Sequence, residues 1–342
     1  MAEVTIYTLA KELNMTPSMV SRALNPKGRI SEEKRRVVLA AAEKYGFSPN
    51  KFASRLSMAA VRVGVLILSR FPVNTDKMLS GIRAAHGEWK DYKVEYDITV
   101  IDPRQCAREE ILEAMRRYQA FDGVILAGMS AAEYTEWING LYAVNKNVVQ
   151  VQAINQEAHC LFASKHDEKT ASFLAAEFLD HCLRYAPRKN VLLFTGDGQS
   201  ALHARAAEAF SAACDQMGLS LLCTVDMKDS EEVLEKLLPL VFAEYGDRVD
   251  GIYITSGLSA PLCRYLEKEG RKIPLVAFDT YEEVKKHLQS GTVAATVSQN
   301  VPRQMKAAFS LLVKHLITGE ECPEVVYTDV QLVFKGNMHQ FD

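Results

Sequence analysis

The sequence predicts a small all-α domain at the amino terminus, followed by an α/β region of two Rossmann-like, doubly wound subdomains. Two observations indicate this fold class. In the first fifty residues, apolar side chains recur at helical spacing in three short segments. From Val61 onward, short apolar runs alternate with longer helical stretches, a pattern typical of β-α units and a parallel sheet. These units would overfill a single sheet, so we expect two.

The first two helical segments predict a helix-turn-helix. We expect Val4–Leu13 to form one helix and Thr16–Leu24 a second, with Asn14 in the left-handed conformation that suits a tight turn. Thr16 can cap the second helix, and Pro17 suits its first position, where a missing N–H costs nothing. Such a second helix can lie in a DNA major groove. Its outer face carries Pro17, Ser18, Ser21 and Arg22.

A third helix is expected after these two. Ser31 can cap its start, and Gly46 can end it in the left-handed geometry. The amino-terminal segments together resemble the signature of the lactose repressor family of bacterial regulators. The resemblance implies a DNA-binding domain over residues 1–49 and a hinge helix with its linker over residues 50–60. Its motifs are Val4-Thr5-Ile6-Tyr7, Val20-Ser21-Arg22-Ala23-Leu24-Asn25 and Tyr45-Gly46-Phe47-Ser48-Pro49-Asn50.

The resemblance also implies which residues contact DNA. Arg22 is expected to pair with a guanine edge, Ser18 to read donors or acceptors, and Pro17 to make only an apolar contact, for example with a thymine methyl. Phosphate contacts are implied for Tyr7, Ser21 and Asn25, and Thr5 belongs to the same DNA-binding set. In the hinge, Leu56 is expected to wedge a central base step and bend the duplex, with Asn50 and Ala53 in register beside it.

In the α/β region we expect strands at the apolar runs and helices between them. Ligand-binding loops then lie at the carboxyl ends of the strands. The predicted strands are Val61–Leu68, Val94–Ile101, Phe121–Ala127, Asn147–Val151, Asn190–Thr195, Leu219–Val225, Val249–Thr255 and Ile273–Phe278. The predicted helices are Asp76–Trp89, Glu109–Tyr118, Glu168–Tyr185, Ala201–Met217, Glu231–Tyr245 and Pro302–Ile317.

Residues 61–342 resemble the sugar-binding sensor of the same family, which is similar to type I periplasmic binding proteins and especially to their ribose-binding branch. Pro274–Thr280 and Ser290–Asn300 carry the resemblance most clearly. It implies that the chain crosses between the subdomains near Asn155, Val293 and Glu324. One subdomain would then span about 61–155 and 294–324, and the other about 156–293 and 325–342.

The resemblance implies an effector site at strand ends in the cleft. Arg205 offers a fork of donors, Asp279 a charged acceptor and Gln299 both functions, and Phe71 can stack on a ring. Simpler roles remain open: Asp279 as a helix cap near Tyr281, Arg205 in a surface ion pair and Phe71 in the core.

Two positions depart from the family pattern. Gln152-Ala153 stand where many relatives carry Asp-Arg, and Ser256-Gly257 where many carry Asn-Asp. Each change removes a charged or multivalent partner for sugar hydroxyls. Gln152 and Ser256 are therefore expected to contact a ligand that is less hydroxylated, or differently charged, than a plain pentose or hexose.

Composition limits the alternatives. A net charge of −3 combines a basic segment over residues 1–60 with an acidic remainder, which suits a nucleic-acid module on a domain with another task. Seven cysteines without paired spacing indicate a reducing compartment, and the lack of a signal or membrane-spanning run predicts a cytoplasmic protein. No catalytic motif, metal-ligand spacing or cofactor fingerprint is recognisable, so we expect neither an enzyme nor a cofactor.

The sequence therefore predicts a repressor that binds a palindromic operator as a homodimer, with a tetramer left open. A small polar effector, a sugar or a similar metabolite, would release it. A corepressor-type or activating regulator that responds to a non-sugar metabolite is the alternative. Less favoured are a solute-binding protein of a transporter, which should have a signal peptide and no basic head, and an α/β enzyme.

Overall fold

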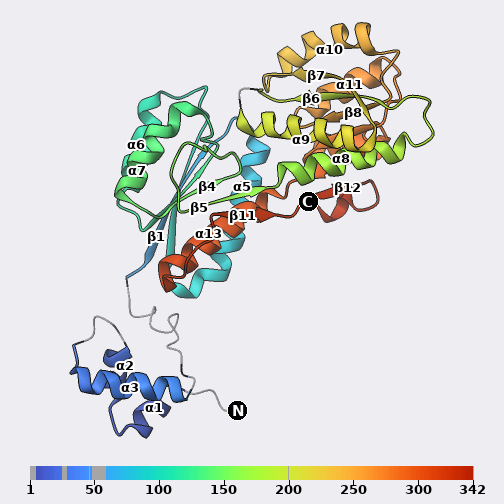
Figure 1. Ribbon diagram of the computed structural model, residues 1–342. Coiled ribbons are helices and arrows are strands. Elements are labelled where there is room, and N and C mark those ends of the chain that lie inside the picture. Colours follow the sequence, from blue (N-terminus) through green and yellow to red (C-terminus); the bar gives the residue numbers. More distant parts are fainter. Residues whose placement is uncertain (1–4, 25–28, 46, 48–58, 199, 342) are drawn as a thin grey trace. The chain divides into compact units, whose positions relative to one another are not determined.

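The computed structural model describes residues 5–24, 29–45, 47, 59–198 and 200–341. The chain divides into two compact units, Met1–Ala59 and Ala60–Asp342, and Figure 1 traces the elements of each. The expected hinge helix, with Asn50, Ala53 and Leu56, lies outside the described residues, as do Asn25 and Gly46.

The smaller unit is the predicted three-helix domain. Its helices are α1 (Ile6–Glu12), α2 (Pro17–Leu24) and α3 (Glu32–Lys44). Asn14 has φ 53°, and the Thr16 hydroxyl accepts from the Met19 N–H at 3.3 Å, so the predicted left-handed turn and helix cap are confirmed. The buried core joins all three helices through Leu9, Ala10, Val20, Ala23, Val38, Ala41 and Ala42.

The larger unit contains two six-stranded sheets. The first sheet is all parallel, with the order β11-β5-β4-β3-β1-β2. Its strands are β1 (Val61–Leu68), β2 (Val94–Ile101), β3 (Gly123–Ala127), β4 (Val148–Val151), β5 (Phe162–His166) and β11 (Val325–Thr328). We call this sheet and its helices the first half. Its helices are α5 (Pro72–Trp89), α6 (Arg108–Tyr118), α7 (Thr135–Val144) and α13 (Val301–Thr318).

Helices cover both faces of this sheet, and β1 is therefore buried on both sides. Val63 and Val65 point to a core with α5 and α13, whereas Leu66 and Leu68 point to a core with α6 and α7. Alternate residues of a strand face opposite sides of a sheet, so a continuous apolar run serves two helix layers. The predicted doubly wound arrangement is confirmed.

The second sheet has the order β12-β10-β9-β8-β6-β7 and is parallel except for the antiparallel pair β10–β12. Its strands are β6 (Asn190–Thr195), β7 (Ser220–Asp226), β8 (Gly251–Ile254), β9 (Leu275–Phe278), β10 (Ala295–Ser298) and β12 (Gln331–Val333). This sheet and its helices form the second half. The helices are α8 (Glu168–Cys182), α9 (Ala201–Met217), α10 (Glu231–Tyr245), α11 (Ser259–Lys268) and α12 (Glu282–Ser290). Helices α8 and α9 pack on one face, and α10, α11 and α12 on the other.

The three crossings between the halves lie later in the chain than expected. The chain crosses after His166, after Ser298 and around Thr328, not near Asn155, Val293 and Glu324. Three short strands account for the difference: β5 and β11 extend the first sheet, and β10 pairs with β9 in the second. Such short runs carry little periodicity, and only the pairing partner assigns them to a sheet.

All eight strands and all six helices predicted by residue range in the α/β region are present, with ends shifted by a few residues. The pattern missed β5, β10, β11 and β12 as strands, and α7 and α11 as helices. For α12, which begins at Glu282, only a helix start near Tyr281 was expected. Among the helices in the described ranges, none is both long and apolar enough to cross a membrane.

Candidate functional site

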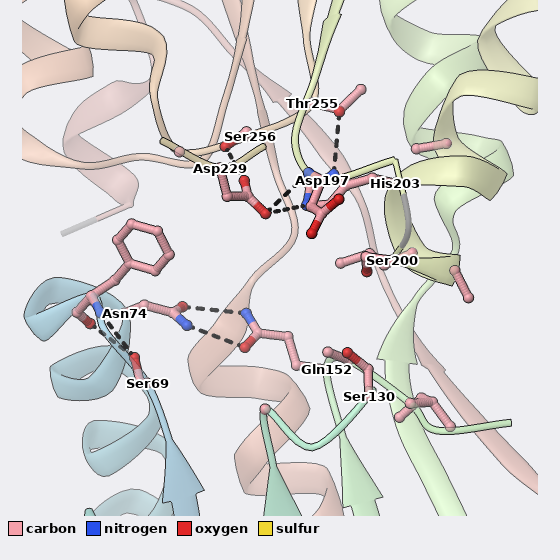
Figure 2. A pocket seen from close by; sticks show the side chains of 18 of the residues that line it. Ser69, Asn74, Ser130, Gln152, Asp197, Ser200, His203, Asp229, Thr255 and Ser256 are labelled. Atoms are coloured by element: carbon pink, nitrogen blue, oxygen red, sulfur yellow. Dashed lines mark hydrogen bonds and ion pairs between the residues drawn. The ribbon is translucent and has the colours of Figure 1, made fainter. Parts of the chain in front are cut away.

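A cavity of about 810 Å³ lies in the larger unit, where the strand ends of both sheets meet. Figure 2 shows polar side chains from both halves around it. Loops at the carboxyl ends of parallel strands form the binding crevice of open α/β sheets, so this position follows from the topology. Polar lining residues that follow strand ends are Ser69 after β1, Ser130 after β3, Gln152 after β4, Asp197 after β6, Asp229 after β7, Ser256 after β8, Asp279 after β9 and Gln299 after β10.

Asp229 is the centre of one polar cluster in the cavity (Figure 2). Its carboxylate accepts from the Ser256 hydroxyl at 2.9 Å, from His203 Nε2 at 3.2 Å and from the Asp197 N–H at 3.3 Å. Burial opposes ionisation, but the hydrogen bond and charge of His203, together with the other two donors, outweigh it and lower the pKa of Asp229 to about 2. The carboxylate is therefore ionised at neutral pH.

Asp279 is the centre of a second, deeper cluster. Gln299 Nε2 donates to both of its carboxylate oxygens at 3.0 and 3.1 Å, and the Tyr281 hydroxyl donates to Oδ2 at 3.0 Å. Burial raises the pKa of Asp279, while Lys77 and these hydrogen bonds act against the rise. The cap position of α12 is occupied by Tyr281, and no side chain caps the helix there. Asp279 therefore does not cap α12, and its carboxylate lines the cavity.

Gln152 and Phe71 line the cavity from the first half. The side-chain amides of Gln152 and Asn74 exchange two hydrogen bonds of 3.2 Å, and Gln152 has φ 69° (Figure 2). Phe71 is 39% exposed and has the Arg70 guanidinium over its ring at 4.9 Å. The core-packing role of Phe71 is therefore wrong, and an apolar ring is available at the cavity surface.

Arg205 does not line the cavity, which corrects its expected placement. Its Nη2 donates to Glu168 Oε1 at 3.1 Å, and Lys165 binds the same carboxylate at 3.0 and 3.1 Å. The next residue, Ala206, lines the cavity instead. Successive residues of a helix are about 100° apart around its axis, so a register difference of one position moves the side chain away from the site.

Two polar contacts bridge the halves at the cavity. The guanidinium of Arg70, just after β1, lies 3.6 Å from Asp229 Oδ2. Lys77 Nζ, on α5, donates to the Thr280 hydroxyl oxygen at 2.9 Å and to the Thr280 carbonyl at 3.2 Å. Burial lowers the pKa of Lys77, and Asp279 opposes that shift. Arg70 and Asp229 line the cavity, whereas Lys77 and Thr280 lie beside lining residues, so the two halves contact each other at and next to the cavity.

The sequence patterns missed several lining residues, among them Asn74, His166, Asp197, His203 and Asp229. Asp197, His166 and Asp229 lie at or near the ends of β6, β5 and β7, so the strand-end rule was a usable signal for them. Asn74 and His203 lie in the first turns of α5 and α9, where sequence offers no such rule. Within the described ranges, no three His, Cys, Asp or Glu side chains gather in a way that could hold a metal ion.

The smaller unit leaves the expected reading face of α2 exposed. Ser18, Ser21 and Arg22 are exposed and Pro17 is half-buried, while Val20 and Ala23 on the other face are buried. Arg22 Nε donates to the Ser18 carbonyl at 3.2 Å, which holds the guanidinium along the helix.

Two other predicted DNA-binding residues lie in and before α1. Tyr7 is 72% exposed. Thr5 caps α1, since its hydroxyl accepts from the Thr8 N–H at 3.3 Å and its own N–H donates to Thr8 Oγ1 at 3.2 Å. The positions of these side chains therefore leave the expected contact surface open.

Many solved structures are similar to the larger unit in fold, among them the following three. A glucose-galactose binding protein from Geobacillus stearothermophilus is 23% identical, with 82% of this chain and 99% of that chain covered and a TM-score of 0.71. A periplasmic ribose ABC transporter from Conexibacter woesei is 17% identical, with 83% and 95% covered and a TM-score of 0.73. A protein from Bacteroides fragilis, provisionally described as a LacI transcriptional regulator, is 19% identical, with 83% and 100% covered and a TM-score of 0.71.

Family models match both units. The model of the periplasmic binding protein domain matches residues 73–321, and that of bacterial regulatory proteins of the lacI family matches residues 5–50. No curated protein matches the sequence. The chain therefore belongs to the periplasmic binding protein domain family and, with a lacI-family helix-turn-helix at its amino terminus, is a ligand-responsive transcription regulator of the LacI/GalR type.

Proposed function

We propose that this regulator represses transcription by binding a near-palindromic operator as a homodimer, and that a small polar effector in the cavity releases it. The observation that carries the proposal is the cavity itself: side chains from both sheets line it, so one ligand contacts both halves at once. Ligand binding in the cavity is therefore coupled to the arrangement of the two halves. A ligand-controlled repressor requires such coupling between its effector site and its conformation.

The DNA side of the proposal rests on α2. Arg22 and Ser18 lie on its exposed face, where an arginine fork can pair with guanine and a hydroxyl can read either donors or acceptors. One such helix covers only a short half-site, so two copies related by a two-fold axis are needed for useful specificity. Tyr7 and Ser21 are proposed to hold phosphates and set the register.

The effector side of the proposal rests on the two carboxylate clusters. The carboxylates of Asp229 and Asp279 can accept hydrogen bonds from ligand hydroxyls. The side-chain amides of Gln152 and Gln299 can donate or accept, and the Phe71 ring can pack against an apolar face of the ligand. We propose a sugar or a related polar metabolite as the effector. The sugars named for the similar solved structures are consistent with that class.

The proposed mechanism is a shift between two arrangements of the halves. Arg70–Asp229 and Lys77–Thr280 hold the halves together across the cavity, and a ligand that replaces or adds to these contacts favours one arrangement. The ligand then changes DNA affinity only by the ratio of its affinities for the two arrangements. Sugar binding and operator release are thus two readouts of one equilibrium.

The first experiment is a thermal-shift screen of the full-length protein against sugars, sugar phosphates, polyols, nucleobases and amino acids. A ligand present at about one hundred times its dissociation constant adds roughly 2.7 kcal/mol of stability. The screen is repeated with Asp279→Asn and with a matched control, Asp180→Asn, whose carboxylate pairs with Lys189 away from the cavity lining. A hit that only Asp279→Asn loses supports the effector site, and a hit that both variants keep contradicts it.

The second experiment selects operators from random duplex DNA with the full-length protein and then adds the hit. Recovery of near-palindromes bound by two chains, and weaker binding with the hit present, supports the proposal. Recovery of single half-sites contradicts the dimer. Tighter binding with the hit present supports the alternative, a corepressor-type or activating regulator.

A further inference from the structure

The helix α2, which carries the expected reading face, is too short to be stable by itself. It contains eight residues, Pro17–Leu24, and the Thr16 hydroxyl caps its start. Isolated helices of this length do not persist in water, so tertiary contacts have to hold α2 in place. Near its last turn the buried side chain is Ala23, whose single methyl group provides little apolar contact.

Arg35 of α3 anchors this last turn. Its Nη1 donates to the Ala23 carbonyl oxygen at 3.0 Å. The last carbonyls of a helix have no partner within the helix, and they lie at the negative end of its dipole. A guanidinium therefore supplies both the missing donor and a favourable charge. A hydrogen bond from a charged donor is also stronger than one between neutral groups.

The position of Arg35 on α3 distinguishes it from the two cations beside it. Arg35 lies one turn before Val38, which is fully buried, so the two residues share the inner face of α3. The Arg35 side chain is 17% exposed, whereas Lys34 and Arg36 are exposed. Glu32 Oε1 lies 3.8 Å from Arg35 Nε and helps to orient the guanidinium from within the same helix.

The anchored turn also carries Arg22, which is expected to pair with a base. Arg22 precedes Ala23, and its Nε donates to the Ser18 carbonyl at 3.2 Å, so the guanidinium follows the backbone of α2. A binding contact of this kind requires its side chain to be held within about 0.5 Å of the productive position. Movement of the last turn would therefore displace the Arg22 guanidinium from the base edge.

We propose that Arg35 is a positioning residue for base recognition, which contacts no DNA and acts on Arg22 through α2. The inference rests on the proposed operator binding and deepens it, because it names a residue outside the reading face that determines specificity. Loss of the anchor should weaken the discrimination between base pairs, which depends on base contacts. Binding to unrelated DNA depends on phosphate contacts and should change little.

The test measures fluorescence anisotropy with the full-length protein and the operator selected from random duplex DNA. The base pair read by Arg22 is identified first, as the one whose preference Arg22→Ala loses. Discrimination is the ratio of the dissociation constants for duplexes with that base pair changed and unchanged. Arg35→Met removes the donor and keeps an unbranched side chain, and we expect it to lower this ratio about three- to tenfold. Arg35→Lys keeps a charged donor and should restore most of the ratio.

Arg36→Met is the matched control, because it removes the same charge from the neighbouring, exposed position. It should leave the discrimination ratio at the wild-type value. The salt dependence gives a second comparison, because each phosphate contact contributes about −0.9 to the slope of log K against log salt. Arg35→Met should keep the wild-type slope. If Arg35→Met does not fold, Arg35→Gln, which also lacks the charge, replaces it.

A double-mutant cycle tests whether Arg35 acts through Arg22. Arg35→Met should weaken operator binding in the wild type, and it should weaken that binding much less in the Arg22→Ala background. Hydrogen exchange followed by mass spectrometry checks the structural part of the argument. In Arg35→Met, exchange should be faster in α2, with α1 and α3 still protected.

The outcomes separate this inference from the proposed function. An unchanged ratio in folded Arg35→Met overturns the positioning role and leaves operator binding in place. A slope smaller by about 0.9, or equal weakening in both backgrounds of the cycle, overturns it by assigning Arg35 a DNA contact of its own. Loss of protection in all three helices of both Arg35→Met and Arg35→Gln reduces Arg35 to a residue needed for folding. If the wild type selects no preferred duplex, the proposed operator binding fails, and the positioning role with it.

Discussion

Replacing Asp229 by Asn should destabilise the protein at neutral pH, and the loss should disappear in acid. The carboxylate is held by Ser256, His203 and the Asp197 N–H, and its side chain is only 17% exposed. The fall of its pKa from 3.8 to about 2 corresponds to about 2 kcal/mol of unfolding free energy. Asn tolerates the left-handed backbone at this position, where φ is 46°, so the substitution changes the charge and not the turn.

The sign of the pH dependence follows from the direction of the shift. Because the pKa is lower in the folded state than in the unfolded state, the stabilisation is complete above about pH 4 and is lost as the pH falls toward 2. Urea unfolding of the wild type and of Asp229→Asn, monitored at pH 7, 5 and 3, should therefore give curves that converge in acid. At pH 7 the melting temperature of the variant should be roughly 4 °C lower.

Asp180→Asn is the control for this measurement. Its ion pair with Lys189 is partly exposed, and such pairs contribute about 0–1 kcal/mol. Equal stability of Asp229→Asn and the wild type at pH 7 would refute the argument. A deficit that is the same at pH 7 and pH 3 would show that lost packing, and not the charge, is responsible.

Four further predictions address the DNA surface, the hinge, the effector site and the fold. Arg22→Ala should weaken specific operator binding by about 1–3 kcal/mol in fluorescence anisotropy, because a bidentate guanine contact is lost. Leu56→Ala should weaken specific operator binding while calorimetry shows unchanged effector binding, and unchanged operator affinity would contradict the hinge prediction. Asp279→Asn should lower effector affinity about 10- to 150-fold in calorimetry while circular dichroism shows the fold preserved, because a hydrogen bond to a charged acceptor is worth about 1.5–3 kcal/mol. Gly128→Ala should cost more than about 2 kcal/mol in urea unfolding, since φ is +79° and an added Cβ would clash with the Leu68 carbonyl.

The elements that the sequence predicted well are those with a strong local signal. The long apolar run of β1 and the capped start of α2 can be read from neighbouring residues alone, because periodicity and capping are local properties. Short strands such as β5 and β10 lack that signal. Their identity depends on a partner strand that is distant in sequence, and for this reason the crossings were expected too early.

The same difference between local signals and distant contacts explains which site residues were predicted correctly. Asp279 and Gln299 were predicted at strand ends, and the structure brings them into one hydrogen-bonded cluster. Arg205 was assigned to the cavity by a resemblance over a helix, where an error of one residue rotates the side chain by about 100°. Its partner Glu168 lies in another helix, so no local pattern could reveal the pair.

By itself, the sequence determined the class of protein: a helix-turn-helix domain joined to a doubly wound α/β sensor, with polar residues at the strand ends. Only the tertiary structure decided which of those residues share a cavity, that Ala206 and not Arg205 faces it, and that His166 and Tyr253 line it without partners. Local patterns follow from the backbone and from periodic burial, which neighbouring residues specify. Charge pairing and orphaned polar atoms depend on contacts between distant segments, and those exist only once the chain is folded.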